Sequence, residues 1–218
     1  EEITMCVDPD LEPFEIINKN GVHEGISADL INLISKKLDI KIRLIPTKTW
    51  EETLNFSKEK KCDILSFLNE TPKRKEWLNF TNPIFEDPNV IVGRNEFDNI
   101  EDLSKLQNKT IAIPKGTAMY ERFEKDFPNL IIIPVETENE AFSLVENKKA
   151  DMTVRSLIIA AYTIKKENLF NLKILAKPLE YKNQLRIGVI KEEPILVNIL
   201  NKGIRNKKKK EHEYIINT

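Results

Sequence analysis

The sequence predicts an α/β protein of two lobes, each a mixed sheet flanked by helices, joined by a hinge of two strands. Three observations support this fold class. Short apolar runs alternate with amphipathic helical segments along the 218 residues. One strand–helix–strand pattern occurs in residues 44–65 and again in residues 132–153. Two isolated extended segments, Val90–Gly93 and Leu185–Ile190, each follow one copy, and they are the expected crossings between the lobes.

The first half begins with a buried strand, Ile3–Val7, which the turn-forming DPDLEP stops. Asn20-Gly21 indicates a hairpin-type turn. Ser27 is the expected N-cap of a helix whose leucines and isoleucines recur at helical spacing. Residues 40–44 then alternate apolar and charged side chains, as a half-buried strand does.

The repeated pattern places a T-x-x-E capping box before each of its helices. Thr49 and Glu52 form the first box. Thr137 and Glu140 form the second. Each helix is followed by Lys-Lys-x-Asp and another apolar strand. Ligands of open α/β sheets bind at the carboxyl ends of the strands, so two facing lobes are expected to form a binding cleft.

The same pattern divides the chain. Pro194 at a first helical position opens a helix that is expected to return to the first lobe, and a second helix through Tyr214 and Ile215 would close the chain. The expected parts are residues 1–90 with 190–218 for lobe 1, 94–184 for lobe 2, and about 90–94 and 185–190 for the hinge.

The composition excludes several function classes. The 34 Lys+Arg against 35 Asp+Glu give a net charge of −1, which argues against a protein that holds nucleic acid. No apolar run reaches the roughly 18 residues of a membrane helix, and no Gly-rich phosphate loop is present. The basic run Arg205–Lys210 is interpreted as the solvated face of the last helix, with a nucleic-acid or membrane-surface patch as the alternative.

Cysteine and histidine give no chemical site. Cys6 and Cys62 lie in apolar, strand-like runs and are interpreted as buried free thiols, with a disulfide as the alternative. Neither His23 nor His212 has partners at metal-ligand spacing, and no nucleophile elbow accompanies them. We therefore expect no metal, no cofactor and no catalytic triad.

Polar residues follow the buried strand CDILSFL at its carboxyl end. Arg74 can hold a carboxylate with a planar, two-pronged grip, and Asn69 and Thr71 can add hydrogen bonds. The alternative is that Arg74 is a solvated surface cation. Trp50 and Leu11 lie in strand-end loops and serve either the core or a ligand platform.

The second half offers corresponding positions. Lys115–Ala118 lies between the apolar strand TIAIP and a helix, where backbone N–H groups can receive an anion. Capping of that helix by Thr117 is the simpler interpretation, and the two are compatible. Ser156 lies at the matching position after MTV and is an expected N-cap.

Four blocks of the sequence, in order, resemble the type II periplasmic solute-binding proteins of the amino-acid-binding kind, the Venus-flytrap domains. Together they extend over most of the chain: residues 7–34 with Pro-Phe-Glu and Gly-x-x-x-Gly, 70–84 with T-x-x-R and Phe-Thr-x-Pro, 100–119, and 146–162.

The resemblance implies a ligand site in which Arg74 clamps a carboxylate and the backbone of Gly116, Thr117 and Ala118 assists. The chain departs from the family in three places, one of which is the loop before Arg74, with Asn69 and Glu70 where the family often has a hydroxyl and a small or apolar residue. Leu11 stands where amino-acid binders have an aromatic residue, and Ser156 where they have the acid that holds the ligand ammonium. Carboxylate capture is expected, but ordinary α-amino-acid recognition is not. The candidate ligand-binding residues are Asp8, Leu11, Trp50, Ser66, Asn69, Glu70, Thr71, Arg74, Gly116, Thr117, Ala118 and Ser156.

The short T-P-x-R loop and the helix at Trp50 look most like the extracytoplasmic sensor domains of histidine kinases and diguanylate cyclases. This likeness implies a periplasmic, membrane-anchored domain that closes on a small polar ligand and signals to a membrane-embedded partner. An end at Thr218, just ahead of a membrane span, fits this expectation. Lys207–Lys210 outside such a span would oppose the positive-inside bias.

Two alternatives stay open. The chain could be the free substrate-binding subunit of an amino-acid-type uptake transporter, with a membrane transport partner. It could also be an enzyme, because the fold resembles cyclohexadienyl dehydratases, and Glu70 is then the nearest candidate acid. We expect no enzymatic activity.

Overall fold

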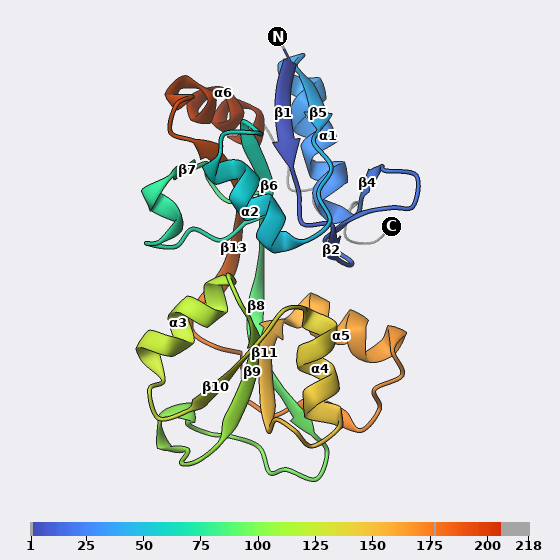
Figure 1. The fold of residues 1–218 in the computed structure, drawn as a ribbon, viewed down its shortest axis with the longest axis vertical. Helices are drawn as coiled ribbons and strands as arrows, with labels where there is room; N and C mark the ends of the chain where they lie inside the picture. Colours follow the sequence, from blue (N-terminus) through green and yellow to red (C-terminus); the bar gives the residue numbers. More distant parts are fainter. Residues whose placement is uncertain (1, 177, 206–218) are drawn as a thin grey trace. The chain divides into compact units, whose positions relative to one another are not determined.

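The computed structural model describes residues 2–176 and 178–205. Within it the chain forms two compact units (Figure 1). Of the described residues, those up to Glu86 and those from Gln184 to Arg205 form unit 1, and those between Asp87 and Asn183 form unit 2.

The chain passes between the units within two strands, β8 (Phe85–Arg94) and β13 (Lys182–Ile190). The expected hinge ranges, about 90–94 and 185–190, lie inside these strands. That movement occurs there stays a prediction. The expected helix through Tyr214 and Ile215, the lysine run Lys207–Lys210 and His212 lie outside the described residues.

Unit 1 is built around a mixed sheet in which β5, β1 and β6 are parallel neighbours and the unit 1 part of β13 runs antiparallel to β6. A short separate sheet of β2, β3 and β4 contains the hairpin predicted at Asn20-Gly21. The elements are β1 (Glu2–Cys6), β2 (Asp10–Leu11), β3 (Glu15–Ile17), β4 (His23–Glu24), α1 (Ile26–Leu38), β5 (Lys41–Leu44), α2 (Trp50–Lys58), β6 (Ile64–Leu68), the 3₁₀ helix η1 (Arg74–Glu76), β7 (Leu78–Phe80) and α6 (Pro194–Arg205).

The predicted cap of α1 is wrong. Gly25, not Ser27, is the N-cap residue, and Ser27 lies buried in the first turn. Gly25 has φ +112°, and a Cβ there would lie 2.5 Å from the carbonyl oxygen of Phe14. Because only glycine fits this close approach of backbones, position 25 determines where the helix begins.

Helix α6 packs on α1 within unit 1. Gly203 allows this close contact, since a Cβ at that position would lie 3.0 Å from side-chain atoms of Ile34 and Leu38. Leu200 is buried, whereas Ile195 and Ile199 on the same helix are exposed.

Unit 2 has a sheet of order β10-β9-β11-β8, in which β10, β9 and β11 are parallel and β8 is antiparallel to β11. Strand β12 pairs with β8. The elements are η2 (Leu103–Lys105), β9 (Thr110–Pro114), α3 (Ala118–Asp126), β10 (Ile131–Val135), α4 (Glu138–Glu146), β11 (Met152–Ser156), α5 (Leu157–Lys166) and β12 (Leu172–Ile174).

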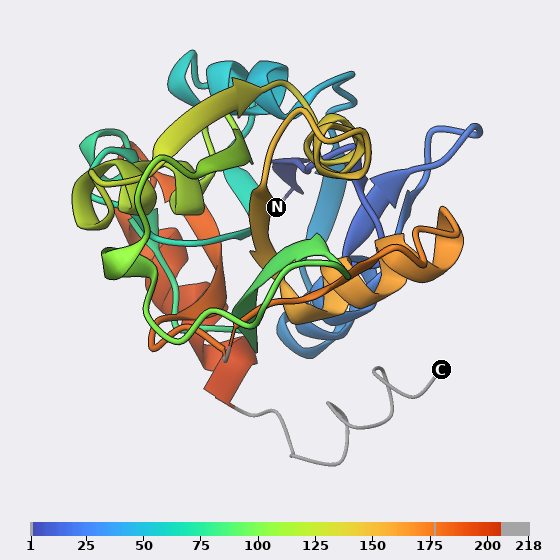
Figure 2. The ribbon, with the colours of Figure 1, turned by 90° about the horizontal axis from the view of Figure 1, so that it is seen from below.

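Helices cover both faces of the unit 2 sheet, with α3 on one side and α4 and α5 on the other (Figures 1 and 2). Alternate residues of β8 show this division. Val90 and Val92 join the cluster with Phe142 of α4, and Ile91 joins the cluster with Phe123 of α3. A strand buried on both faces explains the continuous apolar run of residues 90–92.

The repeated sequence pattern has the same structural role in both units. Thr49 and Thr137 are the N-caps of α2 and α4 as predicted, each accepting a hydrogen bond from the residue three positions on. The aspartate of each Lys-Lys-x-Asp joins two strands. Asp63 accepts from the backbone N–H of Thr4 at 2.9 Å, and its own N–H donates to the Thr4 hydroxyl.

Asp151 and Thr110 make the same reciprocal pair in unit 2, also at 2.9 Å. Asp63 therefore joins the start of β6 to β1, and Asp151 joins the start of β11 to β9. These aspartates are structural, and the similarity of the two units extends to individual hydrogen bonds.

Candidate functional site

Arg74 is a buried cation at the carboxyl end of β6. It opens η1, it is 4% exposed, and its backbone N–H donates to the Thr71 hydroxyl at 3.1 Å. Its Nη1 donates to the carbonyl oxygen of Asn69 at 2.8 Å, and the guanidinium carbon lies 5.5 Å from the centroid of the Trp50 ring. Arg74 is therefore not the solvated surface cation of the alternative interpretation. The structure brings Trp50, Asn69, Thr71 and Arg74 together.

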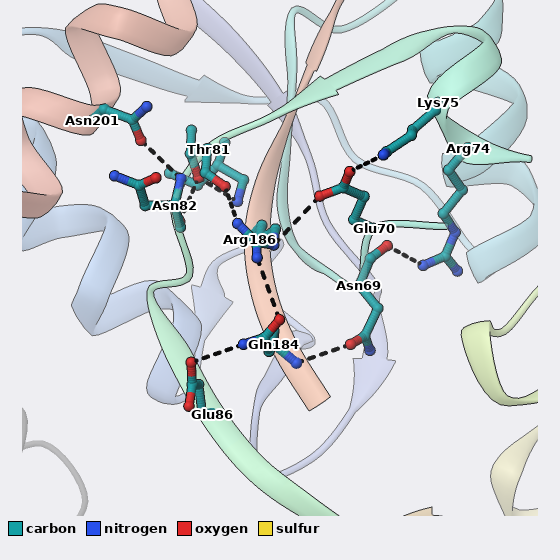
Figure 3. Close-up of polar contacts among 11 residues, drawn as sticks. Asn69, Glu70, Arg74, Lys75, Thr81, Asn82, Glu86, Gln184, Arg186 and Asn201 are labelled. Carbon is teal, nitrogen blue, oxygen red and sulfur yellow. Dashed lines mark hydrogen bonds and ion pairs between the residues drawn. The ribbon is translucent and has the colours of Figure 1, made fainter. Parts of the chain in front are cut away.

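Asn69 also binds the neighbouring strand. Its Oδ1 accepts from the backbone N–H of Gln184 in β13 at 3.0 Å (Figure 3). The same residue thus uses its main-chain oxygen for Arg74 and its side-chain oxygen for β13. This arrangement fixes the loop that carries the guanidinium.

Glu70 lies beside two cations. Its Oε1 is 2.6 Å from Nζ of Lys75, and its Oε2 is 3.7 Å from Nε of Arg186 (Figure 3). The Glu70 carboxylate is therefore engaged in ion pairs with two side chains of unit 1.

A buried carboxylate that the sequence analysis missed, Glu15, connects two of the candidates. Its side chain is 0% exposed and accepts hydrogen bonds from the backbone N–H of Asp8 at 3.0 Å and from the Ser66 hydroxyl at 2.7 Å. His23 lies 2.8 Å from it through Nε2. The available signal was an acidic residue among the apolar residues of PFEII, because a buried acid requires partners.

Leu11 and Glu15 are paired positions of β2 and β3, so Leu11 lies across that hairpin from the Glu15 cluster. Leu11 is half-buried. The unit 1 candidates therefore form two groups, one around Arg74 and one around Glu15.

In unit 2 the turn before α3 has the predicted capping geometry. Thr117 is the N-cap, accepting from the N–H of Tyr120 at 3.3 Å and donating to the carbonyl oxygen of Pro114 at 2.8 Å. Gly116 has φ +72°, a conformation that favours glycine. Lys115 is exposed and pairs with Glu136 at 2.8 Å. The capping interpretation is confirmed, and anion binding by these N–H groups stays a prediction.

Ser156 is the N-cap of α5, as predicted, and it also meets an acid from another strand. Its hydroxyl donates to Asp87, at the start of the unit 2 part of β8. The carboxylate of Asp87 is buried and also accepts from the N–H of Ile158 at 3.2 Å and from Nδ2 of Asn183 at 3.1 Å. The sequence analysis missed Asp87, because an acid beside a proline at a crossing segment has no distinctive pattern.

Burial is the main influence on Asp87 and raises the pKa of its carboxyl. The three hydrogen bonds and the charge of Arg155 act in the opposite direction without cancelling it. Arg155 itself pairs with Glu138 at 2.6 Å, and both side chains are 14% exposed.

Within the described part of the chain, no group of three or more His, Cys, Asp or Glu side chains is arranged to hold a metal ion. None of the described helices combines the length and apolar character that a membrane crossing requires. Cys6 and Cys62 are buried free thiols, so the disulfide alternative is wrong.

The fold and this arrangement can be compared with known proteins. The sequence profile of the bacterial extracellular solute-binding proteins, family 3, matches residues 3–217. The chain belongs to this family. It has the Venus-flytrap fold of type II periplasmic binding proteins, as the resemblance implied.

Among curated relatives, the virulence sensor protein BvgS of Bordetella pertussis is 23% identical over 192 residues. That match covers 88% of this chain but only 16% of BvgS. The ABC transporter arginine-binding protein 1 of Escherichia coli is 23% identical over 69% of this chain and 61% of its own length. A membrane-bound lytic murein transglycosylase F of Shewanella baltica is 24% identical over 60% of this chain and 28% of its length.

Solved structures agree on the fold. The periplasmic VFT2 domain of Bordetella pertussis BvgS has a TM-score of 0.89 at 23% identity, with 99% of this chain and 92% of that chain covered. A histidine kinase sensor domain similar to periplasmic binding proteins has a TM-score of 0.86 at 21% identity, covering 100% and 95%. These two structures are sensor domains, and the chain shares their fold.

Proposed function

We propose that this chain is an extracytoplasmic sensor domain that binds a small polar ligand with a carboxylate and transmits binding to a membrane-linked output domain. The observation that carries the proposal is Arg74. A buried guanidinium at the carboxyl end of β6, beside the Trp50 ring, matches the position where α/β sheets bind ligands. No enzymatic activity is part of the proposal.

The chemistry follows from the guanidinium. Its planar fork of N–H donors matches the two oxygens of a carboxylate, and charge-assisted bonds of this type are about twice as strong as neutral ones. The Trp50 ring lies within the range of a cation–π interaction with it. Thr71, which is 5% exposed and bonded to the Arg74 backbone, supports the same turn.

In unit 2 we propose the start of α3 separately as a place where backbone donors receive an anionic or polar group. Gly116, Thr117 and Ala118 provide the N–H groups, and the helix dipole favours negative charge there.

Transmission is proposed to be a population shift. A ligand that binds one conformation of the domain better than another changes their ratio by its differential affinity alone. The similarity to BvgS and to a histidine kinase sensor domain supports a membrane-anchored signalling role.

A second candidate function is that of a free substrate-binding subunit of an uptake transporter. The match to the Escherichia coli arginine-binding protein favours it. The complete gene separates the two candidates. Membrane and signalling segments in the same polypeptide support the sensor, and a binding protein encoded alone beside transporter genes supports the subunit.

The test begins with a thermal-shift screen of amino acids, other small carboxylates and purines, because a ligand that binds only the folded state raises its melting temperature. Calorimetric titration of the hit then compares wild type with Arg74→Ala. For a carboxylate ligand we expect a loss of about 2–5 kcal/mol, roughly thirtyfold or more in affinity. Arg74→Lys should recover only part of it.

The matched control is Arg43→Ala, which removes an exposed arginine paired with Glu2 elsewhere in unit 1. It should bind the hit as wild type does. If wild type and Arg74→Ala bind a carboxylate ligand with equal affinity, Arg74 does not bind the ligand, and the proposed site is wrong.

A further inference from the structure

The loop that contains Arg74 also contains a carboxylate, that of Glu70. Glu70 lies four residues before Arg74, and Figure 3 shows its carboxylate directed toward Lys75 and Arg186, whereas the Arg74 guanidinium is directed toward the carbonyl of Asn69. A carboxylate this close in the chain has a high effective concentration at the guanidinium. It chemically resembles the ligand that Arg74 is proposed to bind.

Arg186 is fixed independently of Glu70. Its Nη1 donates to the carbonyl oxygen of Thr81 at 2.8 Å, and its Nη2 donates to Oε1 of Gln184 at 3.3 Å (Figure 3). Gln184 in turn donates from Nε2 to Glu86 at 3.2 Å. The side chain of Arg186 is 20% exposed, so its charge acts in a partly desolvated position.

Lys75 alone is a weaker anchor. Its ion pair with Glu70 is short, but the Lys75 side chain is 59% exposed. Solvent screening and the freedom of a long side chain make such exposed pairs weak. The rigid and less exposed charge next to Glu70 is that of Arg186.

We infer that Arg186 is a positioning residue for the anion site: with Lys75 it holds the Glu70 carboxylate away from Arg74, which would otherwise bind it in place of a ligand. The inference rests on the proposed function and deepens it, because it identifies what keeps the site accessible to an external carboxylate. Asn69 contributes by connecting the Arg74 loop to β13. Its carbonyl oxygen accepts a hydrogen bond from Arg74, and its Oδ1 accepts one from the backbone N–H of Gln184.

The test uses three variants of the whole domain: Arg186→Met, Glu70→Gln and the double variant. The probes are L-arginine, L-glutamine and succinate, titrated by calorimetry. We expect Arg186→Met to weaken binding of the probe about tenfold. Glu70→Gln alone should stay within about threefold of wild type. The double variant should recover the wild-type affinity, because a neutral amide no longer competes for the guanidinium.

A merely structural role of Arg186 would not be rescued by Glu70→Gln, so the rescue is the decisive result. Lys75→Met, an exposed change that leaves the β13 hydrogen bonds intact, provides a second variant. It should lose less affinity than Arg186→Met and recover in the same way with Glu70→Gln. Arg43→Met is the matched control for loss of an arginine from unit 1 and should bind as wild type does.

A readout without ligand separates this inference from the proposed function. The indole N–H resonance of Trp50, assigned with Trp50→Phe, reports on the guanidinium beside its ring. Arg186→Met should shift this resonance and the double variant should return it. If no probe binds the wild type, the proposed function fails for these ligands. The Trp50 resonance of the ligand-free variants then still tests whether Arg186 positions Glu70. Absence of rescue by Glu70→Gln, or no shift in Arg186→Met, overturns it.

Discussion

Asp87 places a carboxylate beside position 156. The family resemblance expects an acid at position 156, where this chain has serine. The Ser156 hydroxyl donates to Asp87, so a carboxylate is present there but comes from β8. An acid introduced at position 156 would face that of Asp87, and two like charges at this distance disfavour each other's ionisation.

The burial of Asp87 gives a prediction about pH. Because burial raises its pKa above the ordinary 3.8, the folded state prefers the protonated carboxyl more than the unfolded chain does. This contribution to stability is fully present below the unfolded pKa and is lost as pH rises through the folded pKa. The side chain of the Asp87→Asn variant stays neutral. We therefore expect its free energy of unfolding, measured with urea, to fall less than that of wild type as pH rises from about 4 to about 7.

Asp102→Asn is the control, because the pH dependence that Asp102 gives to stability has the opposite sign. Hydrogen bonds from Ser104 lower the pKa of the exposed Asp102, so its contribution is present above the unfolded pKa and lost as pH falls through the folded one. If Asp87→Asn and wild type show the same pH dependence, the carboxylate of Asp87 is not destabilised in the folded protein.

At the scale of elements, the two units use one set of devices twice. The threonine caps of α2 and α4 were visible as sequence patterns. Each cap acts within one helical turn, whereas the Thr–Asp pairs that join β1 to β6 and β9 to β11 connect residues far apart in the chain. The start of α1 is different, because it depends on the backbone of Phe14, which the chain brings back beside Gly25.

Gly25 and Gly21 form a natural pair for testing that difference. Both have positive φ, but a Cβ at Gly21 meets nothing within 4 Å, whereas one at Gly25 meets backbone. We expect Gly21→Ala to reduce the free energy of unfolding by about 1–2 kcal/mol from backbone strain alone. Gly25→Ala should lose more, about 3 kcal/mol or above, because the backbone of Phe14 must also move. Similar losses measured by urea unfolding would contradict the close-approach argument.

At the scale of the whole molecule, Cys6 and Cys62 report on opening of unit 1. Both are almost fully buried in a core cluster with Leu65 and Leu78. The hydrogen bond to Cys62 and burial raise the pKa of the Cys6 thiol, so the reactive thiolate is disfavoured.

We expect a thiol reagent to modify neither cysteine in the native domain at neutral pH and both after unfolding in urea. The labelling rate should follow the unfolding of unit 1, because exposure of these residues requires its core to open. A ligand found in the screen should slow labelling. Rapid modification of the native protein would contradict this burial, and no thiol after unfolding without reductant would indicate a disulfide.

The sequence by itself determined the family, the α/β class, the two capped helices of the repeat and the position of Arg74 after a buried strand. These features are encoded in periodicity, in capping boxes and in the order of four short blocks, all of which act over a few residues or one helical turn. The caps at Thr117 and Ser156 followed from the same local reasoning.

Only the tertiary structure decided the partners of these charged side chains. It joined Glu15 to Ser66, Asp87 to Ser156 and Glu70 to Arg186, pairs separated by many residues in the chain. It also moved the start of α1 from Ser27 to Gly25. A buried polar group must find a partner, but the sequence does not record which distant segment will supply it. Packing of strands and loops in three dimensions makes that choice.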